Sequence, residues 1–408
     1  MSLPEVFDRH YLDLCTNRIH DMPEVVVSNN RVPTVNVLIP AFDFNSISAG
    51  FFGVFQVARF IASIGVNVRL VLFDNFFFDE NLFRAKLLGY PGMEALFDEL
   101  ETAYIGERLK PLEVSPYDNC VATVWYSAYF ADKIMSKIGN RPFLYLIQDY
   151  ETNFFPGGSL FQFADATYSF NYNALFSTRT LRDFFLTSKI GRFKGDWPKF
   201  TYFNNACASS LPDLETFRTK ASNETKKVVF YSRPIVSRNM FELGALALTE
   251  AYKQGIFNGG KWEFIGIGLG SAKIQLSDTV AMTQMQRMNL KEYQEVISTF
   301  DIGLTLMASP HPSLLPFDLG GSGSVVVTNT FATKQQSYFD GICGNVIATA
   351  PSLSGVVEGL AQAVQRSSDL DARHKAATQM LYPRDWSETF DAEHRNFMRS
   401  VFSETIDA

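Results

Sequence analysis

The residues with the clearest chemical potential in this 408-residue chain are arginines at the end of a predicted strand. Arg233 directly follows the apolar run VVFYS, and Arg238 lies five residues later, just before a predicted helix. A helix N-terminus presents unpaired N–H groups and the positive end of the helix dipole, and arginine binds phosphate oxygens through parallel N–H groups. The pattern therefore predicts an anion site, with two solvated loop arginines as the alternative.

A glycine-rich segment and a third arginine extend this prediction. GIGLG (266–270) follows the next predicted strand, where Gly266 and Gly268 would let a ligand approach the backbone closely. The spacing is not G-x-G-x-x-G, so a tight turn is the alternative. Arg287 precedes the helical sequence LKEYQEVISTF and could reach a phosphate from the opposite side of a cleft; a solvated side chain is again the alternative.

The segment SPHPSLLPFDLGGSGSVVVTN (309–329) joins a proline-rich polar loop to a short helix and a buried strand. Asp318 falls on the first turn of that helix, where a carboxylate can cap N–H groups or accept a hydrogen bond from a ribose hydroxyl. Ser309 and His311 lie on the preceding loop, where we expect them to contact a bound sugar.

The first half of the chain offers carboxylates after a strand. Asp149 and Glu151 follow the run FLYLI, and either could serve as an acceptor contact or a base, with surface acids as the alternative. Gly50 and Gly53, in SAGFFGVF, are expected beneath a helix start in the same cleft.

Two similar halves must position these residues. TVNVLI, VFQVARFIASIG and VNVRLVLFD read as strand, helix and strand, and KKVVFYSRP, NMFELGALALTEAYKQG and WEFIGIG repeat that order. Further strands are predicted at 121–124, 143–147, 302–306 and 325–328. The fold class is therefore α/β, with two tandem Rossmann-like domains whose strand ends face one central cleft.

The domain limits follow from changes in composition along the chain. We expect an N-terminal extension (1–33), a first Rossmann-like domain (34–210) and a polar, turn-rich linker (211–227). A second Rossmann-like domain (228–383) follows, and then a C-terminal helix (384–408) that crosses back to the first domain.

Composition narrows the class of protein. The formal net charge of −7 and a pI near 5.4 argue against nucleic-acid binding. The four cysteines lie far apart without a C-x-x-C pair, which indicates reduced thiols in a cytoplasmic protein. No secretory signal or membrane-spanning run is apparent.

Other reactive patterns are missing from the sequence. G-x-S-x-G, H-E-x-x-H and a Walker loop do not occur. The one D-x-D sequence, Asp369 to Asp371, lies in a polar helical stretch and not at a strand end, so we expect no metal–diphosphate site there.

Taken together, these motifs resemble a known family. NVLIP, YSRP…SRN, EFIGIG, LKEYQEVISTFDIGLTLMASPHP and PFDLGGSGSVVVTN are similar to the retaining GT-B glycosyltransferases of family 4, from about residue 34 onward. YLIQDYETNFFPGGSLFQFADATYSF and SPHPSLLPFDLGGSG resemble rhamnosyltransferases of the WsaF type, which use dTDP-β-L-rhamnose. The resemblance makes the first domain the acceptor domain and the second the nucleotide-sugar donor domain.

The resemblance also assigns roles to single residues. The strand-end arginine that holds the donor diphosphate falls on Arg233, and the next basic position falls on Arg238. A second diphosphate contact, usually lysine, matches Arg287, whose geometry differs from that of lysine. The carboxylate that binds the nucleoside sugar falls on Asp318, where glutamate is usual, and Pro310 stands where the broader family has the first glutamate of E-x7-E. His311 or nearby backbone would substitute for that glutamate.

The implied reaction is sugar transfer with retention, in which the leaving diphosphate helps to deprotonate the acceptor hydroxyl. Arg233 and Arg287 would stabilise the charge on that diphosphate without a metal or other cofactor. The implied partners are a dTDP-linked sugar and a lipid-linked or protein-linked glycan. The basic, aromatic segment TSKIGRFKGDWPKF (187–200) suits contact with an anionic membrane surface, with a solvated loop as the alternative.

Two other functions compete with this interpretation. A GT-B-shaped binding subunit without turnover is favoured by the missing glutamate at Pro310 and opposed by the presence of Arg233, Arg238, Arg287 and Asp318. A nucleotide-sugar epimerase would need acid or histidine groups at the anomeric centre, and the sequence does not supply a recognisable set.

Overall fold

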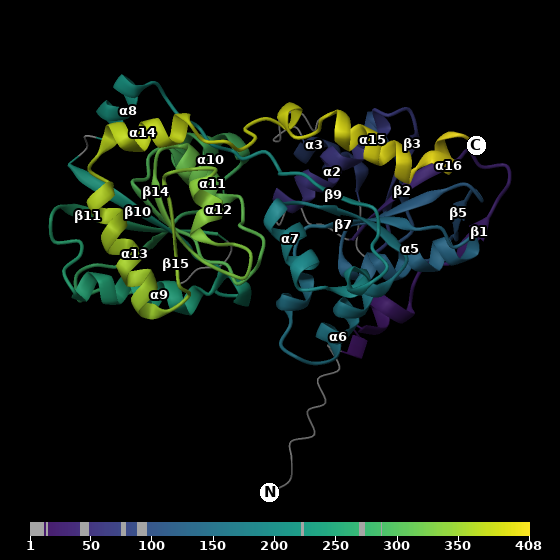
Figure 1. Ribbon diagram of the computed structural model, residues 1–408, viewed down its shortest axis with the longest axis horizontal. Coiled ribbons are helices and arrows are strands. Elements are labelled where there is room, and N and C mark those ends of the chain that lie inside the picture. The colour runs from purple at the N-terminus through teal and green to yellow at the C-terminus, as the bar shows by residue number, and fades with distance from the viewer. Residues whose placement is uncertain are drawn as a thin grey trace, which may run out of the picture. The chain divides into compact units, whose positions relative to one another are not determined.

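The chain folds into two compact units, each built around a parallel sheet (Figure 1). The computed structural model describes residues 12–13, 15–40, 49–74, 79–87, 96–221, 224–268, 274–286 and 288–408. Unit 1 comprises residues 1–177, 185–203 and 390–408, and unit 2 comprises residues 178–184 and 204–389.

Unit 1 contains a seven-stranded sheet in the order β4-β3-β2-β6-β7-β8-β9, and every adjacent pair is parallel. The strands are β2 (Thr34–Ile39), β3 (Asn67–Leu72), β4 (Glu101–Tyr104), β6 (Asn119–Ala122), β7 (Phe143–Ile147), β8 (Tyr172–Phe176) and β9 (Phe200–Tyr202). All residues of β2 and β7 are buried, as expected for continuous apolar runs covered on both faces. The predicted strands TVNVLI and FLYLI are thereby confirmed.

Helical segments and a small second sheet complete unit 1. The helical segments are η1 (Thr16–His20), α2 (Ala49–Ala62), α3 (Glu80–Leu87), α4 (Leu96–Glu99), α5 (Trp125–Lys137), η3 (Glu151–Phe154), α6 (Ser159–Ala166), η4 (Thr167–Ser169) and η5 (Gly191–Lys194). Helix α7 (Arg179–Thr187) begins in unit 2 and ends in unit 1. Strands β1 (Val25–Val27) and β5 (Leu112–Val114) pair in parallel apart from the main sheet.

The C-terminal segment returns to unit 1, as the sequence predicted, and carries α15 (Ala392–Val401) and α16 (Ser403–Ile406). Phe390 stacks on Phe60 of α2 with 4.4 Å between ring centroids, and Nε2 of His394 lies 2.8 Å from the Tyr202 carbonyl oxygen at the end of β9. The start of α15 is capped by Asp391, which accepts hydrogen bonds from two of its backbone N–H groups. These contacts attach the segment to α2 and β9.

Unit 2 contains a six-stranded parallel sheet in the order β12-β11-β10-β13-β14-β15. Its strands are β10 (Thr225–Tyr231), β11 (Lys261–Ile267), β12 (Thr283–Gln284), β13 (Ile302–Leu304), β14 (Val325–Asn329) and β15 (Val346–Thr349). The chain runs outward from β10 to β12 and then returns to β13 beside β10. The strand order therefore reverses between β10 and β13.

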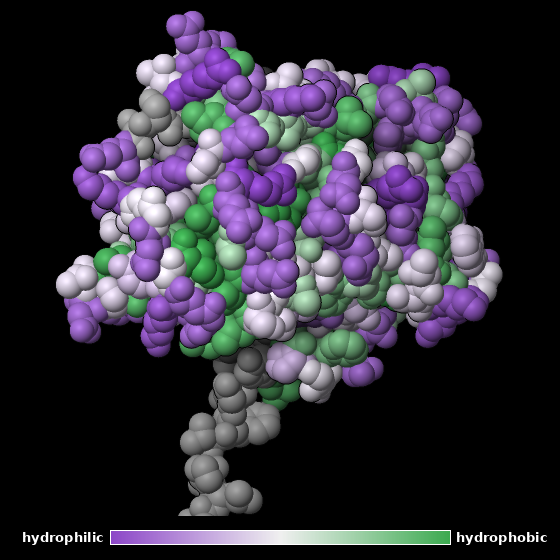
Figure 2. Space-filling view, turned by 60° about the vertical axis from the view of Figure 1, so that its left-hand side comes forward, coloured by the Kyte–Doolittle hydropathy of each residue, from purple (hydrophilic) through white to green (hydrophobic). Residues whose placement is uncertain are grey.

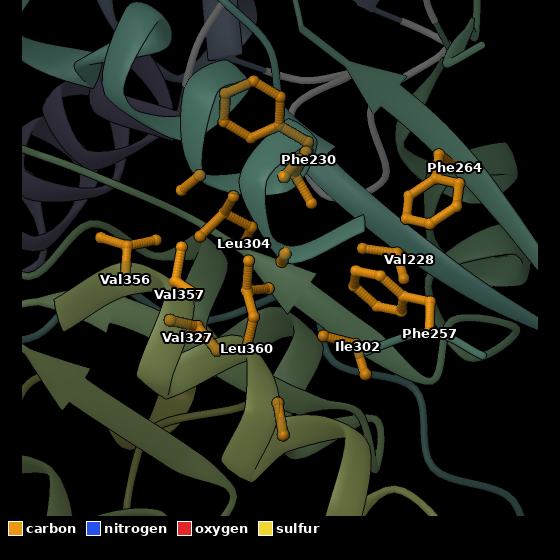
Figure 3. Close-up of a cluster of buried hydrophobic side chains, with 14 of the residues drawn as sticks. Val228, Phe230, Phe257, Phe264, Ile302, Leu304, Val327, Val356, Val357 and Leu360 are labelled. Carbon is orange, nitrogen blue, oxygen red and sulfur yellow. The ribbon is translucent and has the colours of Figure 1, made fainter. Parts of the chain in front are cut away.

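Helices cover both faces of this sheet. The helical segments of unit 2 are α8 (Leu214–Ala221), η6 (Ser237–Asn239), α9 (Phe241–Lys253), α10 (Leu290–Ile297), α11 (Leu315–Gly321), α12 (Gln336–Asp340), α13 (Leu353–Arg366), α14 (Leu370–Thr378) and η7 (Trp386–Glu388). Figure 3 shows Val356 and Leu360 of α13 beside Leu304 of the sheet, in the core that α9 also lines. Helices α10, α11 and α12 pack on the opposite face. Successive side chains of a strand point to opposite faces of the sheet, and every residue of β13 and β14 is buried, so both faces are apolar.

The segment 211–227, predicted as a linker, is not a linker in the structure. It contains α8 and the first residues of β10, and it belongs to unit 2. Part of its polar character is explained by helix capping. Asp213 accepts hydrogen bonds from the N–H groups of Glu215 and Thr216 at the start of α8. Phe217 is buried, with its ring 5.5 Å from that of His374, so the segment is docked. The chain passes between the units at 177–178, 184–185, 203–204 and 389–390, and none of these points lies in 211–227.

The surface carries mainly hydrophilic residues, with hydrophobic side chains gathered between them on the face that Figure 2 shows. Among the exposed apolar side chains are Leu246 of α9 and Leu353 of α13. A shallow groove between these helices is lined by apolar side chains and by Glu250 and Glu358. It contains none of the residues that the sequence analysis selected. Among the described helices, none is both long and apolar enough to cross a membrane.

Gly191 should be a position where unit 1 tolerates no side chain. Its φ is +52°, and a Cβ atom there would lie 1.8 Å from the carbonyl oxygen of buried Tyr168. We expect Gly191→Ala to lower the free energy of unfolding by more than about 3 kcal/mol, measured by urea denaturation. Gly139→Ala is the matched control, because its φ of +104° is also positive but the space around it is open. Its loss should be about 1 kcal/mol, and equal losses at the two positions would contradict the steric explanation.

Candidate functional site

The reversal of strand order between β10 and β13 marks the point in unit 2 where ligands bind in open parallel sheets. The carboxyl ends of these two strands are adjacent, because Phe230 pairs with Leu304. Arg233 and Arg238 follow β10, Gly268 follows β11, and Ser309 and His311 follow β13. The topology therefore brings these expected site residues to one edge of the sheet.

Arg233 lies two residues beyond the end of β10, with its side chain half-buried. One Nη1–H donates to the hydroxyl oxygen of Tyr231 at 3.0 Å, and the guanidinium lies 5.6 Å from the centre of that ring. Its Nε has no hydrogen-bond partner among the described residues. The group is thus held by Tyr231 while N–H donors remain that could bind an anion.

Different contacts explain why Gly266 and Gly268 are glycines. Gly268 has a φ of +128°, and a Cβ atom there would lie 2.7 Å from both Cγ of Arg233 and the carbonyl oxygen of Ser232. It therefore allows Arg233 to pack against the end of β11. A Cβ atom at Gly266 would lie 2.3 Å from Oε1 of Gln284, so close packing against β12 accounts for this glycine without a ligand.

Arg238 lies on η6, directly before α9. Its carbonyl oxygen accepts a hydrogen bond from the N–H of Ala308 at 2.7 Å, and Nδ2 of Asn239 donates to the carbonyl oxygen of Leu306. Helix α9 then begins after Met240, whose φ is +45°, and no described side chain caps its first N–H groups. The arrangement combines a helix N-terminus with two nearby arginines in the sequence, as an anion site requires.

Arg287 lies outside the described residues, so its predicted contact with a diphosphate stays a prediction. Helix α10, which follows it, is well defined by a capping box in which Asn289 and Glu292 bond to each other's backbone N–H groups.

The loop after β13 is organised by hydrogen bonds between its own residues. The Ser309 hydroxyl oxygen accepts a bond from the N–H of His311, and Nδ1 of His311 accepts one from the N–H of Ser313 at 3.0 Å. The His311 ring therefore carries its proton on Nε2, where it is a donor. Ser313 has a φ of +67°, unusual for a residue other than glycine. Ser309 is fully buried and His311 is 8% exposed.

Asp318 is buried in the first turn of α11 but does not cap that helix. Its Oδ1 accepts a hydrogen bond from the N–H of Ala208 at 2.6 Å, and its Oδ2 accepts one from the hydroxyl of Tyr293 at 2.9 Å. The carboxylate thus connects α10, α11 and the segment around residue 208. A ribose contact would have to use the remaining lone pairs of these two oxygens.

Burial controls the protonation of this group. It raises the pKa of the Asp318 carboxyl from 3.8 to about 6, against the opposing effect of the bonds from Ala208 and Tyr293. Burial and the neighbouring carboxylate raise the pKa of the Tyr293 hydroxyl well above 10, so this group stays a donor. Tyr293 was not among the residues selected from the sequence. Its partner lies 25 residues away, which no local pattern reveals.

The candidate acids of unit 1 both lie after β7 and are largely buried. Oδ1 of Asp149 accepts a hydrogen bond from the N–H of Tyr150 at 2.8 Å. Oε2 of Glu151 accepts one from the N–H of Trp125, the first residue of α5, and its own N–H donates to the Tyr168 hydroxyl. A carboxylate at a helix start is favourable, so Glu151 has a structural role at α5.

The glycines of unit 1 lie within α2, not in a loop before it. Gly50 and Gly53 are the second and fifth residues of this helix, and Gly53 is buried. The segment 41–48, which joins β2 to α2, lies outside the described residues. The predicted loop position of these two glycines is therefore wrong, because both belong to the helix. Their contact with a ligand stays a prediction.

Among the described residues, no group of three or more His, Cys, Asp or Glu side chains could hold a metal ion. The two aspartates of the D-x-D sequence have other partners, because Asp369 caps α14 and Asp371 forms an ion pair with Arg218. Both carboxylates thus have protein partners, and the expectation that no metal–diphosphate site lies there stays a prediction.

Several buried polar residues at the same edge of unit 2 had not been selected from the sequence. The hydroxyl oxygens of Ser232 and Thr305 have no hydrogen-bond partner among the described residues. Asn329 and Lys334, both fully buried, bond to the backbone of Met307. Their position within or just after apolar strands could have indicated these residues from the sequence. Their hydrogen-bond partners could not be predicted, because they are distant in the sequence.

Comparison with family models gives two matches. The model described as WsaF, N-terminal domain, matches residues 34–179, and the model described as WsaF, C-terminal domain, matches residues 226–361. The chain is also 26% identical over 354 residues to the O-antigen biosynthesis protein RfbC of Myxococcus xanthus. This match covers 84% of the chain and 25% of RfbC, so the chain spans a quarter of that relative's length.

Solved structures share the fold at low sequence identity. WaaG, a glycosyltransferase involved in lipopolysaccharide biosynthesis, matches with a TM-score of 0.54 and 13% identity, covering 92% of this chain and 100% of WaaG. HepE of Anabaena, in complex with UDP-glucose, matches with a TM-score of 0.55 and 14% identity, covering 92% of this chain and 99% of HepE. The predicted fold class, α/β with two Rossmann-like domains as in the GT-B glycosyltransferases, is thereby confirmed.

The raised pKa of Asp318 should appear in the pH dependence of stability. Because the folded state holds this proton more tightly than the unfolded state does, the contribution of Asp318 is complete below pH about 4. It is lost as the pH rises through about 6. The loss amounts to about 3 kcal/mol for a shift of this size. Asp318→Asn should therefore gain stability relative to the wild type between pH 4 and 7, measured by urea unfolding.

Asp371→Asn is the control for this measurement. The hydrogen bond from Arg218 lowers the pKa of Asp371, so removing that charge should not reproduce the gain. Parallel stability profiles for the wild type and Asp318→Asn would show that the Asp318 carboxyl does not titrate in this range.

Proposed function

The chain belongs to the WsaF family, and we propose on that basis that it is a glycosyltransferase acting in the synthesis of a bacterial surface polysaccharide or glycoprotein glycan. It moves a sugar from a nucleotide diphosphate donor to a glycan acceptor. The names of RfbC and WaaG, which refer to O-antigen and lipopolysaccharide biosynthesis, support this assignment. The UDP-glucose bound to HepE supports a nucleotide-sugar donor.

The observation that carries the proposal is the anion-binding arrangement on the loop between β10 and α9. Arg233 has N–H donors left beyond its bond to Tyr231, and the uncapped N-terminus of α9 follows Arg238. A diphosphate is the anion that this arrangement suits, because two arginines and a helix dipole together offset about two negative charges.

The donor is proposed to be dTDP-β-L-rhamnose, and the transfer is proposed to proceed with retention. The motifs shared with rhamnosyltransferases of the WsaF type support the sugar. In this mechanism Arg233 and Arg287 stabilise the charge that develops on the leaving diphosphate, which in turn accepts the proton of the acceptor hydroxyl. The positive charge comes from arginine side chains, so no metal ion is required.

The acceptor is proposed to be a lipid-linked or protein-linked glycan, and the enzyme to work in the cytoplasm, at the inner membrane face. Within the segment 187–200, Trp197 is 53% exposed, whereas Phe193 is buried and Arg192 is paired with Asp196. Any membrane contact by this segment therefore depends on Trp197 and on its lysines.

A non-catalytic binding subunit of the same fold is the second candidate. Pro310 favours it, because this residue stands where the broader family has a glutamate. The existing hydrogen bonds of Asp318 to Ala208 and Tyr293 add to that case. The two candidates share nucleotide binding and differ in turnover.

Nucleotide binding should be selective and should not need a metal. We expect dTDP, but not UDP, GDP, ADP or CMP, to raise the melting temperature, both with and without EDTA. Ligand at about one hundred times its dissociation constant adds about 2.7 kcal/mol, which is several degrees for a domain of this size. Selectivity for another nucleotide would keep the enzyme class and remove rhamnose. No shift with any nucleotide would contradict the proposed donor site.

Arg233 should contribute to the transition state. Arg233→Ala is expected to lower kcat/KM for dTDP-rhamnose roughly a hundredfold, about 3 kcal/mol, without unfolding the protein. Arg218→Ala is the matched control, because Arg218 is an exposed arginine of the same unit that pairs with Asp371. An unchanged rate in folded Arg233→Ala would remove Arg233 from the mechanism, and turnover itself separates the enzyme from the binding subunit.

A further inference from the structure

Lys334 is a fully buried lysine at the carboxyl edge of the unit 2 sheet, five residues beyond β14. Lysine is among the residues least often buried completely, because its amino group loses water that the interior must replace. Neither the motifs of the family resemblance nor the mechanism above uses this residue. Its burial therefore calls for a specific explanation.

The Lys334 side chain is directed inward by a tight turn. Phe331 and Lys334 exchange two backbone hydrogen bonds, and Ala332 between them has a φ of +44°. Thr333 anchors the same turn by donating its hydroxyl proton to the carbonyl oxygen of Thr180 at 2.7 Å. These contacts hold the Lys334 backbone in place independently of the contacts that its side chain makes.

The Lys334 side chain ends at the backbone of Met307. Its Nζ donates to the Met307 carbonyl oxygen at 2.7 Å. Asn329, the last residue of β14, accepts a bond from the Met307 N–H at 2.7 Å and donates to the same carbonyl oxygen at 3.1 Å. Two buried side chains therefore replace the strand partner that the Met307 backbone lacks beyond β13.

Met307 in turn connects two loops of the candidate site. Its carbonyl oxygen also accepts a bond from the N–H of Ser309, which begins the loop that carries His311. The adjacent Ala308 donates its N–H to the carbonyl oxygen of Arg238 on the loop before α9. A shift of the Met307 backbone would consequently move both loops.

From this geometry we propose that Lys334 is a positioning residue of the donor site. Through the Met307 carbonyl it holds the loops of Arg238 and His311 in the arrangement that binds the nucleotide diphosphate. The proposal rests on the proposed function, because it assigns to that site one further residue that does not touch the donor.

A packing role alone accounts less well for Lys334. An unbranched apolar residue such as methionine would fill a similar volume without the desolvation of an amino group. What lysine adds is a donor that reaches a backbone oxygen. The consequence to measure is therefore binding and not only stability.

Calorimetric titration of the full chain with dTDP and UDP tests the proposal. Lys334→Met should weaken binding of the preferred nucleotide by about tenfold, the effect of losing one buried hydrogen bond. Lys334→Arg, which keeps a donor, should recover part of the affinity. In turnover assays the KM for the donor should rise while the KM for the acceptor stays unchanged.

Lys226→Met is the matched control, because Lys226 lies near the amino end of β10 and its Nζ bonds to the hydroxyls of Ser367 and Ser368. It should alter stability without changing nucleotide affinity. Hydrogen exchange at the amides of Met307, Ala308 and Ser309 should become faster in Lys334→Met and stay unchanged in the control.

The outcomes separate the two proposals. Unchanged affinity in folded Lys334→Met, or an equal loss in Lys226→Met, would overturn the positioning role while leaving the proposed function intact. Failure of the wild type to bind any of dTDP, UDP, GDP, ADP and CMP would overturn both. If Lys334→Met does not fold, Lys334→Leu, which also removes the donor, is judged by nucleotide affinity on the same criteria.

Discussion

The backbone groups beyond the carboxyl ends of β10 and β13 are the constraint on which the rest of unit 2 depends. Where a strand loses its neighbour, its N–H and C=O groups need other partners if they are buried. The side chains of Asn329 and Lys334 form hydrogen bonds with the Met307 backbone. The side chain of Asn239 donates to the Leu306 carbonyl oxygen, and the N–H of Ala308 donates to the Arg238 carbonyl oxygen. The same bonds that satisfy these groups hold the site loops in place.

Buried carboxylates serve the same purpose in both units. Glu151 accepts from the first N–H of α5 in unit 1, and Asp318 accepts from the N–H of Ala208 in unit 2. Each carboxylate was a candidate for chemistry and is found holding the backbone of another segment. Such carboxylates can also contact a substrate only through lone pairs that are not already used in hydrogen bonds. Whether they do so therefore depends on the geometry of the site and not on the residue type.

Arg233 differs from these carboxylates because its contacts with the described residues leave N–H donors unused. Its bond to Tyr231 fixes the guanidinium, and Gly268 allows the close approach of its side chain. Sugar transfer from a diphosphate requires stabilisation of charge more than covalent chemistry by the protein. Arg233 thus places a fixed positive charge at the end of β10, although the chain as a whole has a net charge of −7.

The sequence by itself determined the fold class, most central strands and the place of Arg233, Arg238 and His311 after them, because apolar runs and glycine turns act locally. Only the tertiary structure decided that 211–227 is docked in unit 2, that Asp318 bonds to Ala208 and that Lys334 reaches Met307. The physical reason is that buried polar groups take the partner that the packed sheet brings near, and that partner is often far away in the sequence.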